Sequence, residues 1–93
     1  MIQGTIQQVK DLLTRRRAAY RRVFKKDNQS TEIVLKDLAK FCRAHESTVH
    51  KKEHITFVLE GRREVFTRIQ QQLNLSDEDI WKLYQLDDRS DKA

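Results

Sequence analysis

The 93-residue sequence has no proline, only two glycines and a single cysteine. The scarcity of proline and glycine excludes collagen-like chains and Pro/Gly-rich disordered chains. One cysteine, Cys42, cannot form an intramolecular disulfide, so nothing requires an oxidising compartment. The longest apolar run near the middle, residues 55–59, already contains Thr56, whereas a membrane span needs about 20 apolar residues. The first ten residues also lack the apolar segment of a secretory signal. We therefore expect a soluble protein that contacts no membrane.

Charged residues, by contrast, make up 35% of the sequence, and the net charge is +5. The positive excess lies at one end. Residues 1–26 contain eight basic side chains and one acidic side chain, for a net +7, whereas residues 27–93 contain 11 basic and 13 acidic, for a net −2. Such asymmetry is typical of chains that contact nucleic acid or an acidic surface of a partner.

Apolar residues recur at helical spacing along most of the chain, which predicts an all-α fold: a small bundle of three longer helices plus a short C-terminal helix. We expect one helical domain over residues 1–93, with 87–93 a frayed tail. The predicted helices cover Thr5 to about Lys26, Ser30 or Thr31 to Ala44, Glu53 to Leu73, and the segment that follows the cap Ser76. Thr5, Ser30 and Ser76 are suitable N-caps because their hydroxyls accept hydrogen bonds from free helix N–H groups.

The main functional candidate is a basic face on the first predicted helix. Its side chains lie outside the apolar arc and can bind a partner or nucleic acid: Arg15, Arg17, Arg21, Arg22, Lys25 and Lys26. Such a cluster can neutralise DNA phosphates without reading sequence, dock on an acidic protein surface, or simply be solvated. No arrangement typical of a helix-turn-helix recognition helix is present.

Two arginines do not fit the apolar pattern. Arg16 lies at the centre of the first apolar stripe, and Arg62 lies at the centre of the third, next to Gly61. A buried guanidinium needs a partner, so we predict structural ion pairs, with Asp37 first and Glu64 second as partners of Arg62. A subunit interface or a phosphate is the alternative environment. We expect Gly61 to let a neighbouring helix approach closely.

One cysteine and three histidines lie close together in the sequence: Cys42, His45, His50 and His54. Their spacing is loosely that of a compact zinc site, but Cys42 also completes an apolar helical face, where a free cysteine acts as a small hydrophobe. Both interpretations stay open. Trp81 and Tyr84 lie on the short last helix and are residue types favoured at interfaces.

Nothing in the sequence indicates catalysis. It has no glycine-rich phosphate loop, no nucleophile with a base at a typical spacing, and no metalloprotease motif. A chain this short also offers little volume for a substrate pocket. We expect no enzyme, no catalytic residue, no cofactor or metal, and no small-molecule substrate.

Several stretches resemble a family of short phage- and prophage-encoded helical proteins of largely unassigned role, which are encoded near virion structural genes of short-tailed phages. The stretches that carry the resemblance are AYRRVF (19–24), DLAKFC (37–42), STVH (47–50), EGRREVF (60–66) and LNL (73–75). The resemblance covers residues 18–83, and EGRREVF is its strongest element. The chain departs from similar proteins after His50, where Lys51 and Lys52 stand in place of a proline.

The resemblance implies a phage protein and a minor virion component, made in the host cytoplasm and located in the virion. Combined with the basic helix, it favours an adaptor that docks to other virion proteins, in a multi-copy assembly, or to packaged DNA. A sequence-independent DNA-binding module and an early regulator that binds a host protein are the alternatives.

Overall fold

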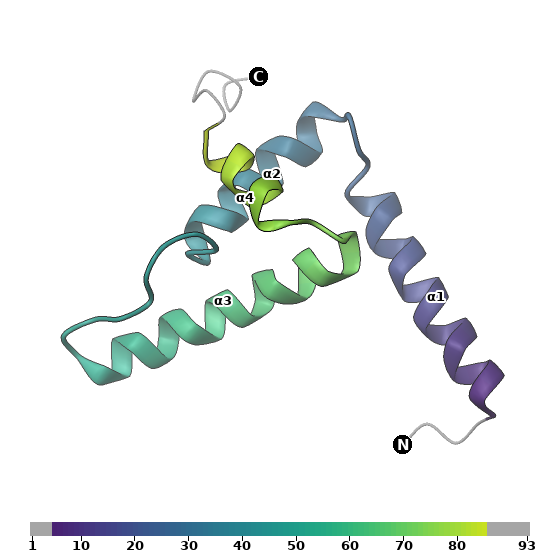
Figure 1. Cartoon of the computed structure of the whole chain (residues 1–93), viewed down its shortest axis with the longest axis horizontal. Helices are drawn as coiled ribbons and strands as arrows, with labels where there is room; N and C mark the ends of the chain where they lie inside the picture. Colours follow the sequence, from purple (N-terminus) through teal and green to yellow (C-terminus); the bar gives the residue numbers. More distant parts are fainter. Residues whose placement is uncertain (1–4, 86–93) are drawn as a thin grey trace.

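The computed structural model describes residues 5–85 as four helices, with no strand among them (Figure 1). The helices are α1 (Ile6–Val23), α2 (Gln29–Phe41), α3 (Glu53–Leu73) and α4 (Asp77–Tyr84). This confirms the predicted all-α fold of three longer helices and a short last one. The bounds of α3 agree with the prediction, and the predicted frayed tail lies outside the described residues.

The break between α1 and α2 differs from the sequence prediction. α1 ends at Val23 rather than Lys26, and Asp27 adopts a left-handed backbone with φ of 60°. Asn28, not Ser30, caps α2, because its side-chain oxygen accepts from the N–H groups of Ser30 and Thr31 at 2.9 and 3.3 Å. Asparagine is as good an N-cap as serine, and here the earlier of the two candidates starts the helix. α2 likewise ends three residues before the predicted Ala44.

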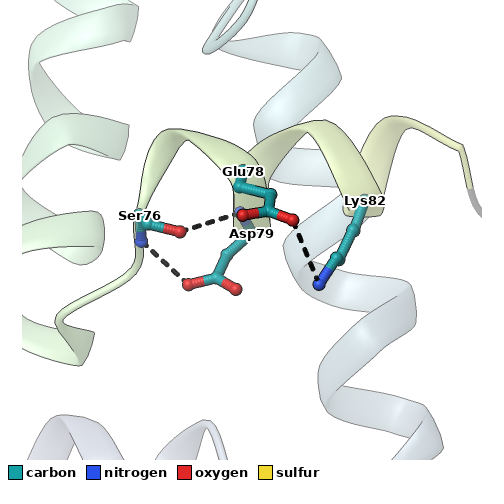
Figure 2. Close-up of polar contacts among 4 residues, drawn as sticks. All are labelled: Ser76, Glu78, Asp79 and Lys82. Carbon is teal, nitrogen blue, oxygen red and sulfur yellow. Dashed lines mark hydrogen bonds and ion pairs between the residues drawn. The ribbon is translucent and has the colours of Figure 1, made fainter.

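The last helix starts as its sequence predicts. Ser76 Oγ accepts from the Asp79 N–H at 3.1 Å, and the Asp79 carboxylate accepts from the Ser76 N–H at 2.8 Å, which forms a capping box (Figure 2). The hydrogen bond from the Ser76 backbone N–H to the Asp79 carboxylate is the largest influence that lowers the pKa of Asp79, and the Ser76 hydroxyl lowers it further. One turn further on, Lys82 Nζ lies 3.7 Å from Glu78 Oε1 on the exposed side of α4.

The core lies where α2, α3 and α4 meet, and α1 adds nothing fully buried to it. Phe66 of α3 and Ile80 of α4 are each 1% exposed and pack with Ala39 and Cys42 at the end of α2. α2 packs mainly against α4, whereas α1 contacts α3. None of the helices in residues 5–85 is long and apolar enough to cross a membrane.

The loop between α2 and α3 is fixed by polar contacts rather than by apolar packing. Thr48 is buried and its hydroxyl donates to the Glu60 carboxylate of α3. The His50 N–H donates to Thr56 Oγ1 at 2.8 Å, and the Lys52 N–H donates to the His50 imidazole at 3.0 Å. These bonds hold the loop against the first half of α3.

Candidate docking surface

α1 is a helix that its own chain leaves largely uncovered. No residue of α1 is buried. Figure 1 shows its N-terminal half running away from α3, while its C-terminal half lies near the C-terminal end of α3. We call residues 5–15 the arm. Three of the four apolar side chains of the arm are exposed, Ile6 by 77%, Leu13 by 51% and Leu12 by 37%, and Val9 is half-buried.

Local interactions, not tertiary packing, hold the arm helical. Thr5 and Gln8 form a capping box, in which the Thr5 hydroxyl accepts from the Gln8 N–H at 3.2 Å and Gln8 Oε1 accepts from the Thr5 N–H at 2.8 Å. One turn on, the Gln7 side-chain amide donates to Asp11 at 3.0 Å. An isolated helix of this length is marginal in water, so a partner that covers the arm would also stabilise it.

Four side chains of the predicted basic face lie on α1, whereas Lys25 and Lys26 lie in the turn after its end, because α1 stops at Val23. All six side chains of the face are exposed: Arg15, Arg17, Arg21, Arg22, Lys25 and Lys26. Arg16, in the centre of the apolar stripe, is half-buried. No ion pair links any of these seven to another residue of the described segment 5–85. The arm therefore presents an apolar stripe with basic residues on both of its sides.

Arg62 does not form the predicted ion pair with Asp37 or Glu64. It is exposed, and its guanidinium lies 4.4 Å from the centre of the Phe41 ring. A cation–π contact satisfies an arginine on an apolar stripe without burying its charge. The pairing with Asp37 fails because Phe41, at the end of α2, is the side chain that faces Arg62.

Gly61 does not serve as a contact between helices of this chain. A methyl group at its Cα would meet nothing within 4 Å. The glycine therefore lies on an open face of α3, beside Phe57, which is 65% exposed. A shallow depression of about 530 Å³ covers this face, lined by Phe57, Glu60, Gly61, Arg63, Glu64 and Thr67.

The two aromatic residues predicted at an interface have different environments. Trp81 is 46% exposed and its ring centre lies 5.0 Å from that of His45. Tyr84 is half-buried: its hydroxyl donates to the Ala39 carbonyl at 3.1 Å and accepts from the His45 N–H at 3.3 Å. Burial, the largest influence, raises the pKa of Tyr84. Tyr84 thus fastens α4 to the end of α2, which is a structural role, while Trp81 remains accessible.

The structure favours the hydrophobic interpretation of Cys42. Its side chain is 4% exposed within the core, and burial raises the pKa of its thiol. His45 contacts Trp81 and Tyr84, and His50 accepts from a backbone N–H. Within residues 5–85, no three Cys, His, Asp or Glu side chains converge as metal ligands.

Sequence reasoning missed the exposed apolar surface. A periodic pattern identifies an apolar face but not what covers it, so the sequence does not distinguish an exposed stripe from a buried one. Phe57 is a different case, since it lies opposite Phe66 on the helical wheel of α3. An aromatic residue so far from the apolar stripe was a visible signal of a second contact face.

Fold and surface together define a small all-α protein with a basic amphipathic helix that extends from a three-helix core. The family model for Bbp19-like phage proteins matches residues 20–85. The match covers more than half of the sequence, so the chain belongs to the Bbp19-like phage protein family. The comparison with curated proteins gives no match, and neither does the comparison with solved structures. The matched segment begins at Tyr20, so the arm precedes it.

Proposed function

We propose that this phage protein is a non-enzymatic adaptor of the virion, which docks through α1 to an acidic surface of other virion proteins. One observation carries the proposal: a capped, amphipathic helix of 18 residues has no buried residue in its own chain. Contiguous exposed apolar surface rimmed by polar residues marks protein interaction sites. The exposed basic side chains of α1 and of the turn that follows it add the preference for an acidic partner.

The exposed apolar side chains favour a protein over DNA as the partner of the arm. Binding to the phosphate backbone uses cations and gains nothing from Ile6, Leu12 or Leu13. A protein groove would remove these three side chains from water, at about 25 cal/mol for each Å² of apolar surface covered.

Mass spectrometry of purified particles tests the adaptor, and the chain is expected among the virion proteins. Substitution of Arg15→Glu together with Arg17→Glu should remove the chain from particles. Lys51→Glu with Lys52→Glu is the matched control, because it changes the net charge equally at two exposed loop positions. The control variant should be incorporated normally. Absence of the wild-type chain from particles, or equal incorporation of both variants, would overturn the proposal.

Sequence-independent DNA binding is the second candidate, and the net charge of +7 in residues 1–26 favours it. Arg21, Arg22 and Lys25 remain exposed even if a protein covers the arm. A titration with duplex DNA should then show an affinity that falls steeply as salt increases and is the same for unrelated sequences. No binding at low salt would exclude this candidate.

A further inference from the structure

We propose that the occupant of the arm is a second copy of this chain, and that the arm docks on the open face of α3 around Gly61. This proposal rests on the proposed function to the extent that α1 is the docking element, and it names the partner. The contact is head-to-tail, because the arm of one copy meets a different surface of the next copy.

The open face of α3 has the shape that a docking helix needs. Phe57 is 65% exposed and projects beside Gly61, where the absence of a side chain leaves the helix surface open. The depression of about 530 Å³ lies over these two residues. A glycine in the interior of an exposed helix makes that helix less stable than alanine would. No contact within residues 5–85 uses the space that this glycine leaves, but a helix from another copy would.

Charge also matches between the two surfaces. The depression is lined by Glu60 and Glu64. Glu53, one turn before Phe57, and Arg68, one turn after Glu64, lie on the same side of α3, so carboxylates outnumber cations on this face. Glu64 and Glu53 form no ion pair in the described part of the chain. The one basic side chain at the depression, Arg63, donates to the Glu46 carbonyl at 3.3 Å.

The arm supplies the complementary pattern. Its apolar side chains can cover Phe57, while basic residues on both sides of the stripe reach the carboxylates of α3. Pairing of two copies through α1 is disfavoured, because Arg16 lies in the middle of its apolar stripe and Lys10, Arg15 and Arg17 flank that stripe. Like charges would face one another in that arrangement. A head-to-tail contact instead repeats from copy to copy and closes into a ring when the rotation allows.

The experiment uses two variants, each of which breaks one side of the contact. Leu13→Glu places a carboxylate in the arm, and Phe57→Lys places a cation in the face of α3. Both side chains are more than half exposed, so the fold should persist, which circular dichroism checks. Val34→Glu, at a residue of α2 that is 46% exposed, is the control.

Analytical ultracentrifugation across the micromolar range gives the readout. The wild-type chain and the control should form species larger than a dimer, and each interface variant should associate at least about tenfold more weakly. An equimolar mixture of the two variants should form a 1:1 pair, because the intact arm of Phe57→Lys meets the intact α3 face of Leu13→Glu.

Three results would overturn the proposal: a wild-type chain that stays monomeric, association that is insensitive to Phe57→Lys, or a mixture that forms no pair. Incorporation into particles is measured separately. A chain that is incorporated through its arm but never self-associates would refute the head-to-tail contact and leave the adaptor function standing.

Discussion

Replacement of Phe66 by alanine should remove a large part of the stability of this protein. Phe66 is 1% exposed and is, with Ile80, one of only two large side chains that are completely enclosed in the described structure. Phe→Ala in a core costs about 3–5 kcal/mol. A chain of this length has a free energy of unfolding of about 5–14 kcal/mol. The core cluster of this protein has four buried residues, so we expect a value toward the lower end of that range. The variant should therefore be unfolded or melt at least about 10 °C lower.

Phe57→Ala provides the matched control, because the same ring is removed from the same helix at a position that is 65% exposed. Its midpoint in urea should be unchanged or slightly higher, since alanine is the better helix former. Measurements below the concentration of any self-association keep the two variants comparable. If Phe66→Ala has no transition, Ile80→Val should still show a loss of about 0.5–1.5 kcal/mol. Equal midpoints for Phe66→Ala and Phe57→Ala would refute this account of the core.

Three further predictions concern polar contacts. Arg62→Ala should lower the free energy of unfolding by only about 0.5–1 kcal/mol, the value of an exposed cation–π contact, and a loss of several kcal/mol in urea denaturation would instead indicate a buried charge. Tyr84→Phe should lower the free energy of unfolding by about 1 kcal/mol. Because the folded state raises the pKa of Tyr84, the stability of the wild-type chain should fall as pH rises above about 10. Thermal melts of the variant should lack the share of this loss that comes from Tyr84. Ser76→Ala should lower the free energy of unfolding by about 1 kcal/mol. Because the folded state lowers the pKa of Asp79, its carboxylate stabilises the fold above about pH 4, and this stabilisation is lost as pH falls. The melting temperature of Asp79→Asn should therefore depend less on pH below that value.

Most local structure follows from the sequence. The Thr5 and Ser76 caps and the bounds of α3 are as predicted, and Cys42 takes the hydrophobic one of its two possible environments. Each depends on residues close together in the chain or on a strong apolar period. The predicted N-cap of α2, Ser30, is wrong, because Asn28 and Ser30 are chemically equivalent candidates and Asn28 caps the helix.

The environments of Arg62 and Gly61 could not be predicted in the same way. The sequence shows an arginine on an apolar stripe but not that Phe41, from another helix, lies 4.4 Å from its guanidinium. It shows a glycine in a helix but not that the space beside it is open. Both facts depend on how helices far apart in the sequence are placed relative to one another.

The sequence by itself determined four helices, their caps, and the concentration of positive charge in residues 1–26, because these depend on periodicity, short-range hydrogen bonds and composition. Only the tertiary structure decided that the apolar stripe of the arm is exposed rather than packed in the core. The stripe has the same 3.6-residue period whether its own chain or another protein covers it. The turn at Asp27 and the divergence of α1 from α3 leave Ile6, Leu12 and Leu13 in solvent. Residues 5–85 leave this surface uncovered, which makes it a candidate contact for a partner.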